Sequence, residues 1–179
     1  LTMQEFAAAR AFAQRDDDEW WAQVRGKLFD AQWRKTLELL PGCLYDDGGR
    51  RRVDEFLRRV LDETGVDLLS VARIVGLLGR LLPTLSAYQY PIKPELGVRL
   101  KEIQVRTLPI FTREGAAQVP VQVRLDAAEA LAAAGFPRPE GDFIPLPGKG
   151  VSLGKYLVTV AEFARFITDN GYADNSLWD

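Results

Sequence analysis

The sequence contains no histidine and only one cysteine among its 179 residues. The absence of histidine excludes nucleophilic sites in which an imidazole serves as the base, and it removes the commonest side-chain ligand of transition metals. The single cysteine, Cys43, excludes a disulfide bond within the chain and is typical of a reducing compartment. We therefore expect a cytoplasmic protein, and because no basic and then apolar leader opens the sequence, we expect no signal peptide.

An excess of charge of either sign is also missing. The 23 lysines and arginines face 25 aspartates and glutamates, which gives a formal net charge of -2. Such a balance creates no overall field that would attract nucleic acid or an anionic membrane, so we expect neither as a partner. The most apolar stretch, 66–85, is predicted to be a buried helix rather than a membrane span, because it is interrupted by Asp67, Arg73, Arg80 and Pro83.

The sequence that is present predicts a mainly helical region up to about residue 135. A hydrophobic content of 47% with 27% charged residues is typical of a globular protein with a core. After a turn at 46–49, residues 50–63 form the clearest amphipathic helix, with apolar residues at helical spacing. Further helices are predicted over 2–14, 16–28, 33–44, 68–82, 95–111 and 120–134.

Prolines and glycines mark the predicted ends of these helices. Pro41-Gly42 closes the helix that begins at residue 33, and Pro83 ends the apolar helix 68–82. Residues 115–119 are predicted to be a loop, and Gly135 stops the last helix of the region. In the apolar helix, which we expect at the centre of the bundle, Gly76 and Gly79 would let a neighbouring helix approach closely.

The last part of the chain has a different pattern. Two short β-prone runs, Phe143–Leu146 and Tyr156–Val158, are separated by the glycines of 148–150. Thr159 and Glu162 have the spacing of a capping box at a helix start, and Asn170-Gly171 is typical of a helix stop. Between them, one apolar helix face is formed by Val160, Phe163, Phe166 and Ile167.

This order resembles the opening of the formylglycine-generating enzyme (sulfatase-modifying factor) domain, which has a C-type-lectin-like fold. The matching residues are Phe143 to Gly148 (FIPLPG), Gly154 to Thr159 (GKYLVT), Glu162-Phe163, Phe166, Gly171-Tyr172 and Trp178. The resemblance implies that residues 142–179 are only the start of such a domain, so that the rest of the domain, or another chain, would cover them.

The opening of the chain resembles the helical region that follows the nucleotide-binding core of NACHT-type STAND NTPases. The matching residues are Leu1-Thr2, Gln4-Glu5-Phe6, Ala8-Ala9-Arg10, Trp33-Arg34, Leu37, Leu39-Leu40, Gly42 and Leu44. The phosphate-binding loop that defines such an NTPase is absent. Residues 123–131 look like a single HEAT-like helix, of the kind that leads into the formylglycine-type domain of NTPase fusions.

Several patterns suggest chemistry, and each has a plainer explanation. Residues 148–154 invite a phosphate-loop interpretation, but the glycine spacing fits neither known fingerprint, and we expect a connection of the hairpin type. Arg50-Arg51-Arg52 could contact phosphates of nucleic acid. The same helix carries Asp54, Glu55, Asp62 and Glu63, so we expect a solvated face with ion pairs.

The remaining candidates are also predicted to be structural. Asp16 to Glu19 could bind a hard cation, but helix capping is the better explanation. Trp20, Trp21 and Trp33 could form a stacking platform, whereas their helical setting favours core or interface packing. Cys43 lies upstream of the formylglycine-type segment and is predicted to be a small buried hydrophobe. We therefore assign no catalytic residue, metal ligand or cofactor, and the ligand-binding residues stay unknown.

Three functions fit these observations. The first is a ligand-recognition protein with a lectin-like scaffold, similar to the variable proteins of diversity-generating retroelements that are attached to NACHT-type signalling modules; its ligand is expected to be a protein. The second is a formylglycine-generating oxidoreductase whose copper-binding cysteine pair lies beyond this segment. The third is a helical interaction module of a STAND NTPase. The predicted fold is α+β: a helical domain over 1–135, a Pro/Gly joint at 136–141, and the lectin-like start at 142–179.

Overall fold

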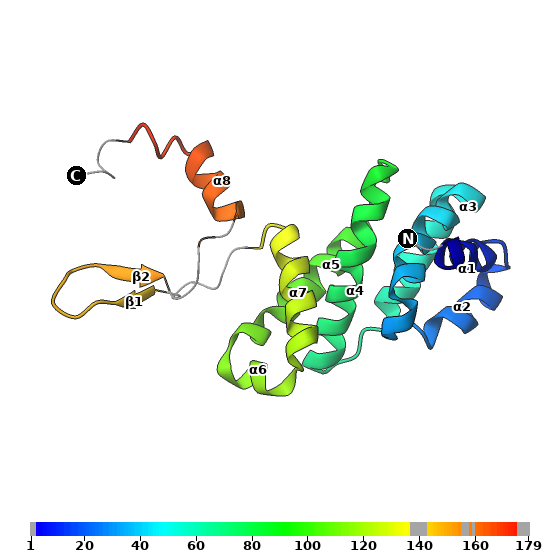
Figure 1. The fold of residues 1–179 in the computed structure, drawn as a ribbon, viewed down its shortest axis with the longest axis horizontal. Coiled ribbons are helices and arrows are strands. Elements are labelled where there is room, and N and C mark those ends of the chain that lie inside the picture. The colour runs from blue at the N-terminus through cyan, green and yellow to red at the C-terminus, as the bar shows by residue number, and fades with distance from the viewer. Residues whose placement is uncertain (1–2, 137–142, 155–157, 159, 175–179) are drawn as a thin grey trace. The chain divides into compact units, whose positions relative to one another are not determined.

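The computed structural model describes residues 3–136, 143–154, 158 and 160–174. By its internal contacts the chain divides into two units, Leu1–Leu131 and Ala132–Asp179. The described residues are mostly helical with one small two-stranded sheet, so the α+β class with a dominant helical part is confirmed (Figure 1). The predicted joint at 136–141 lies almost wholly outside the described residues.

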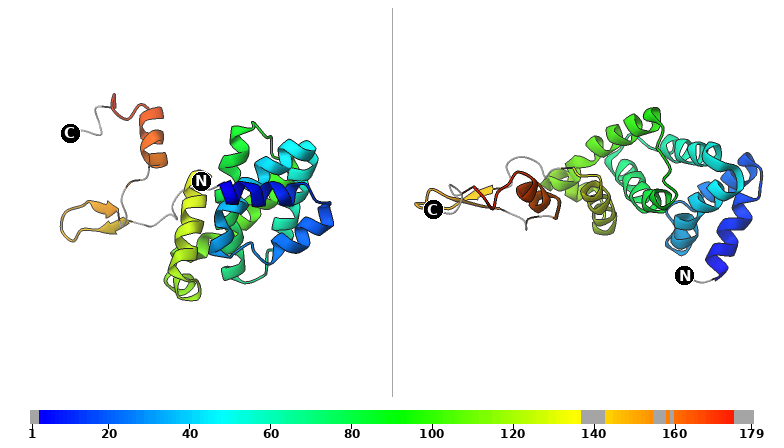
Figure 2. Two further views of the ribbon diagram at one scale, coloured as in Figure 1. Left: turned by 45° about the vertical axis from the view of Figure 1, so that its right-hand side comes forward. Right: turned by 90° about the horizontal axis from the view of Figure 1, so that it is seen from above.

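The first unit is a bundle of helices around α4 (Figures 1 and 2). Seven α-helices and two short 3-10 helices follow one another in this part of the described chain: α1 (Met3–Ala13), α2 (Asp17–Arg25), η1 (Ala31–Trp33), α3 (Arg34–Asp62), α4 (Leu68–Ala87), α5 (Pro94–Thr107), η2 (Leu108–Phe111), α6 (Arg113–Gln118) and α7 (Val121–Ala133).

Helix α3 is bent at Gly49, where the backbone has φ 64° and ψ -158°. Glycine adopts this conformation readily, whereas residues with a Cβ atom rarely do. The predicted turn at 46–49 is therefore this bend between two helical arms. The predicted closure at Pro41-Gly42 is wrong, since Pro41 lies inside the first arm. The burial of Leu37 and Leu44 on that arm outweighs the loss of one backbone hydrogen bond at the proline.

Helix α4 is the core helix of the unit, as predicted. It begins at Asp67, whose side chain accepts a hydrogen bond from the Ser70 backbone N–H, and it continues past Pro83 to Ala87. The predicted end at Pro83 is wrong because Leu85, which is 1% exposed, is held in the core by one more helical turn. By length and composition α4 is the one described helix that could cross a membrane, but half of its apolar window is buried within the protein.

Helix α7 crosses α4 at the two glycines that were expected to permit a close neighbour. A Cβ atom on Gly79 would lie 2.3 Å from the Cβ of Ala130, and one on Gly76 would lie 2.9 Å from the Cβ of Asp126. The guanidinium of Arg80 closes the same crossing with an ion pair to Asp126 at 2.7 Å. The missing side chains therefore set the distance between these two helices.

The segment between α5 and α7 differs from the prediction. The expected helix over 95–111 ends as α5 at Thr107 and continues as the 3-10 helix η2, which contains Pro109. The expected loop at 115–119 is mostly the short helix α6, whose start is capped by the side chain of Thr112 through the backbone N–H of Gly115. Glycine is required there, because a Cβ would lie 2.0 Å from the carbonyl oxygen of Pro109.

The second unit contains the strands β1 (Phe143–Pro145) and β2 (Ser152–Gly154) and the helix α8 (Val160–Thr168). The strands are antiparallel, with Ile144 opposite Leu153. The first strand is where it was predicted, and its partner among the described residues is Ser152–Gly154, a pairing that the sequence did not predict. The predicted strand at 156–158 lies mostly outside the described residues. Tyr156, Leu157, Thr159 and Trp178 lie outside the described residues.

The end of α8 has the predicted left-handed stop. Asn170 has φ 60°, and the backbone N–H groups of Gly171 and Asn170 donate to the carbonyl oxygens of Phe166 and Ile167 at 2.9 and 3.1 Å. This pair of hydrogen bonds is a Schellman motif, which satisfies carbonyl groups that the helix end leaves open.

Candidate functional site

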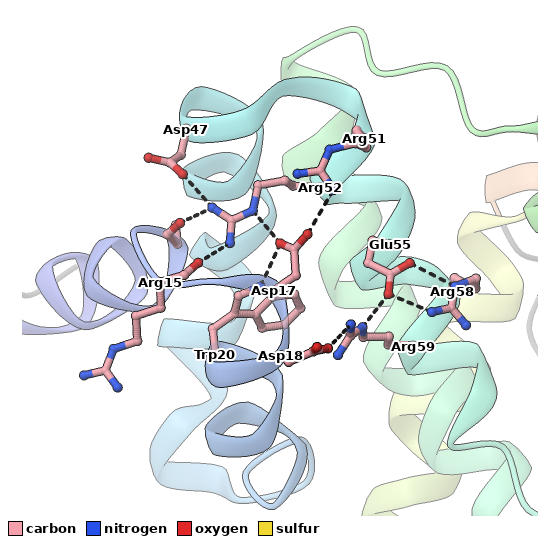
Figure 3. A network of polar contacts seen from close by, with 11 residues as sticks. Arg15, Asp17, Asp18, Trp20, Asp47, Arg51, Arg52, Glu55, Arg58 and Arg59 are labelled. Carbon is pink, nitrogen blue, oxygen red and sulfur yellow. Dashed lines mark hydrogen bonds and ion pairs between the residues drawn. The ribbon is translucent and has the colours of Figure 1, made fainter.

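The most elaborate polar cluster in the described chain surrounds Arg52 (Figure 3). Its side chain is buried, with 5% of the residue exposed. The Nε atom donates to Oδ1 of Asp17 at 2.9 Å, Nη1 donates to Oδ2 of Asp47 at 2.5 Å, and Nη2 donates to the carbonyl oxygen of Arg15 at 2.7 Å. Nη1 also donates to the carbonyl oxygen of Ala13, at the end of α1.

Asp17 is the shared acceptor of this cluster. It also accepts from Nη1 of Arg51 at 2.9 Å and from the indole N–H of Trp20 at 3.3 Å. Burial acts to raise the pKa of Asp17, but the hydrogen bonds from Arg51, Trp20 and Arg52 outweigh burial and leave that pKa below its usual value. The carboxylate is therefore charged at neutral pH and holds three donors at the start of α2.

The solvated face with ion pairs expected around Arg50-Arg51-Arg52 is confirmed for Arg50 and Arg51, which are exposed, and Arg51 pairs with Asp17 at 2.9 Å. Two further arginines of this arm also form ion pairs. Arg58 pairs with Glu55 and Asp62 at 2.7 and 2.6 Å, and Arg59 pairs with Glu55 and Asp18 at 2.5 and 2.7 Å. The partners are neighbours on the same helix or on α2. The pairs of the exposed Arg58 add little stability individually, whereas Arg59 is partly buried. The prediction is wrong for Arg52, because its side chain turns inward at the bend.

Asp54 was also expected on that solvated face and is instead buried, with 9% of the residue exposed. It accepts a hydrogen bond from the hydroxyl of Tyr90 and pairs with Nζ of Lys93 at 2.7 Å. Burial, together with the hydrogen bond and charge of Asp54, raises the pKa of Tyr90 far above its ordinary range. This contact ties the segment before α5 to α3, and Tyr90 stays a neutral hydrogen-bond donor.

The other sequence candidates are structural. Asp16 occupies the N-cap position of α2 but makes no side-chain cap hydrogen bond. Its neighbours Asp17 and Asp18 bind arginines, so the expected capping is replaced in large part by ion pairing. Among the described residues, no group of three or more acidic or cysteine side chains is arranged to hold a metal ion.

The tryptophans pack as expected. Trp20 is 0% exposed, and its ring lies 5.7 Å from the rings of Trp21 and Phe56, centroid to centroid. Trp33 lies 5.7 Å from Phe12 of α1. These contacts join α2 to α3 and α1 to η1, and the three rings form no stacked platform.

Cys43 is buried, as predicted, with 8% of the residue exposed. Burial is the main cause that raises the pKa of its thiol, and the charge of Asp46 adds to it. A thiol with a raised pKa forms little of the reactive thiolate at neutral pH. We therefore assign Cys43 to packing.

Only the first part of the glycine-rich segment 148–154 is a connection: residues 148–151 lie between β1 and β2, and residues 152–154 form β2 itself. Gly148 and Gly150 have φ 75° and 64°, and the backbone N–H of Leu146 donates to the carbonyl oxygen of Val151 at 2.9 Å. The segment closes the β1–β2 hairpin and opens no helix, so the phosphate-loop interpretation has no structural support.

One cavity of about 330 Å³ lies between the end of α3 and α5. Its lining alternates in charge: Asp62 pairs with Arg99 at 2.8 Å, and Arg106 donates to the carbonyl oxygen of Gly65 at 3.0 Å. The hydroxyl of Thr64 is buried there without a hydrogen-bond partner. The charges largely satisfy one another, so the cavity favours no single class of ligand.

The second unit exposes its apolar side chains. In the hairpin, Phe143 and Leu153 are 69% and 59% exposed, and in α8, Phe163 and Ile167 are 45% and 53% exposed. The rings of Phe163, Phe166 and Tyr172 contact one another along one side of α8. We call the exposed apolar residues of the hairpin and of α8 the uncovered face.

Comparison with known proteins adds no assignment: no family model, no curated protein and no solved structure matches the chain. Sequence reasoning missed Arg52, Asp47 and Tyr90 as members of polar clusters. A usable signal was present, because Asp-Asp-Gly-Gly directly before three arginines places two carboxylates and a flexible bend next to a cation. The helical period alone assigned those arginines to solvent.

Proposed function

We propose that the chain joins a helical coupling unit to the opening hairpin and helix of a C-type-lectin-like scaffold, similar to the formylglycine-generating enzyme domain. The scaffold recognises a ligand, most simply a protein, as in variable proteins of diversity-generating retroelements that are attached to NACHT-type modules. The motif order from Phe143 to Tyr172 and the NACHT-like opening of the chain support this proposal.

The uncovered face is the observation that carries it. A two-stranded hairpin is marginally stable in water by itself, and a helix needs a partner for its apolar side. Here a hairpin with exposed Phe143 and Leu153 precedes a helix with exposed Phe163 and Ile167. Such elements become stable when further strands cover them, and the proposed scaffold supplies those strands from the same polypeptide or from another chain.

We expect Phe163→Ser in the natural gene product to destabilise the lectin-like part by roughly 3 kcal/mol, because a covered aromatic side chain would be lost. Arg165→Ser is the matched control, since Arg165 is exposed and lies on the opposite side of α8. Denaturant unfolding of both variants provides the comparison. If Phe163→Ser changes stability no more than the control does, nothing covers α8 and the scaffold proposal is wrong.

A separate assay distinguishes recognition from the oxidoreductase alternative. The natural gene product, loaded with copper, is incubated with oxygen and a cysteine-containing peptide, and the peptide mass is followed. The recognition proposal predicts no conversion of cysteine to formylglycine, whereas the oxidoreductase alternative, with its copper-binding cysteine pair beyond this segment, predicts conversion. Conversion of the peptide would overturn the recognition function while leaving the scaffold intact.

A further inference from the structure

The bend in α3 and the docking of α1 meet at one buried side chain. Arg52 lies three residues after the bend at Gly49, while its partner Asp47 lies two residues before it. The other acceptors are the carbonyl oxygens of Ala13 and Arg15 at the end of α1 and the carboxylate of Asp17 at the start of α2. One guanidinium therefore binds both arms of the bent helix and the α1–α2 connection (Figure 3).

The path of this side chain depends on the two glycines of the bend. A Cβ on Gly48 would lie 2.3 Å from Cδ and 2.6 Å from Cγ of Arg52, so any larger residue there would displace the aliphatic part of the arginine side chain. Gly49 supplies the positive φ that turns the second arm. In this structure Arg52 reaches the end of α1 from the second arm, three residues after the bend.

The burial of the charge makes its contacts interdependent. Burying a guanidinium is costly unless its N–H groups have hydrogen-bond partners and its charge is balanced. If one carboxylate partner is lost, the remaining partners no longer balance the buried positive charge, and their contacts with it become less stable. The side chain of Asp47 is 42% exposed and does not belong to α1 or to the α1–α2 connection. Its carboxylate can therefore be removed by substitution without changing any residue of α1.

We propose that Arg52 is a latch that couples the docking of α1 on α3 to the bend at Gly49. While the bend is formed, the guanidinium binds the end of α1 and the start of α2. When the two arms of α3 separate at the bend, Asp47 moves away from Arg52. The charge of Arg52 is then no longer balanced, and its contacts with α1 and with the α1–α2 connection break. Conversely, undocking of α1 removes partners from Arg52 and thereby weakens its contact with Asp47 across the bend.

The test is backbone hydrogen exchange of α1 in the 179-residue chain, measured for Asp47→Asn. We expect exchange of the α1 amides to accelerate about tenfold, the effect of losing one hydrogen bond to a charged group, while the α5 amides keep their rate. Arg52→Gln should accelerate the same amides at least as much. Arg58→Gln is the control, because it removes two ion pairs from the outer face of α3 and should leave α1 unchanged.

The outcome that overturns the latch is acceleration of α1 exchange by Arg52→Gln but not by Asp47→Asn. Arg52 would then be a cap on the end of α1 with no link to the bend. If Arg52→Gln fails to fold, Asp47→Asn alone decides, because Asp47 is half-exposed and its replacement by the isosteric amide keeps the packing.

Discussion

Replacing Gly79 with valine is expected to lower the free energy of unfolding of the helical unit by about 3 kcal/mol. The first atom of any side chain at this position would lie 2.3 Å from Cβ and 2.9 Å from Cα of Ala130 on α7. The backbone of α7 would have to move away, and with it Leu131, which is 2% exposed, and the Arg80–Asp126 ion pair. Denaturant unfolding followed by helical circular dichroism measures the change.

Gly97→Ala is the matched control for that substitution. Gly97 lies in α5, and a Cβ there would meet no atom within 4 Å. Alanine should therefore stabilise the unit by up to about 1 kcal/mol through helix propensity. If Gly79→Val and Gly97→Ala shift the midpoint in the same direction by similar amounts, the close crossing of α4 and α7 is wrong.

The second large effect is expected from Trp20→Ala, which should destabilise the helical unit by about 3–5 kcal/mol, the range for a buried aromatic residue truncated to alanine. Trp20 is 0% exposed, contacts the ring of Phe56 and donates its indole N–H to Asp17. The substitution leaves a cavity between α2 and α3 and takes one donor from the carboxylate that binds Arg52.

An exposed apolar residue serves as the comparison for Trp20. Val66 is 97% exposed, so Val66→Ala should change the free energy of unfolding by less than about 0.5 kcal/mol. Both variants are unfolded in urea, and the midpoints are compared at unchanged slope. A loss below about 1 kcal/mol for Trp20→Ala would place the indole at the surface and contradict the packing of α2 on α3.

The periodicity of apolar residues predicted most helices of the first unit, because burial of one helical face dominates their stability. The predicted helix ends were wrong where a proline or a glycine was assumed to stop a helix. Pro41 and Pro83 both lie inside helices, since buried leucines on the following turn extend the helix. The loop predicted at 115–119 is wrong for the same reason, because Gly115 lies inside α6, where it permits close packing against Pro109 and does not break the helix.

The polar clusters could be predicted only in part. Spacing along one helix predicted a charged face with ion pairs, and the pairs of Arg58 and Arg59 with Glu55 are of this local kind. It could not identify the partners of Arg52 or Asp54, because Asp17 and Tyr90 are 35 and 36 residues away in sequence. Long-range contacts of this kind depend on how the helices pack, and a periodic pattern carries no information on them.

The helical unit has its own core, whereas the second unit has an uncovered face that needs a partner. Hydrogen exchange measured by mass spectrometry on the 179-residue chain tests this contrast most directly. We expect the amides of α4 to exchange only through global unfolding, whereas those of β1, β2 and α8 should exchange close to the rate of an unfolded chain. Protection of α8 equal to that of α4 would contradict it, because the second unit would then be stable without any covering strands.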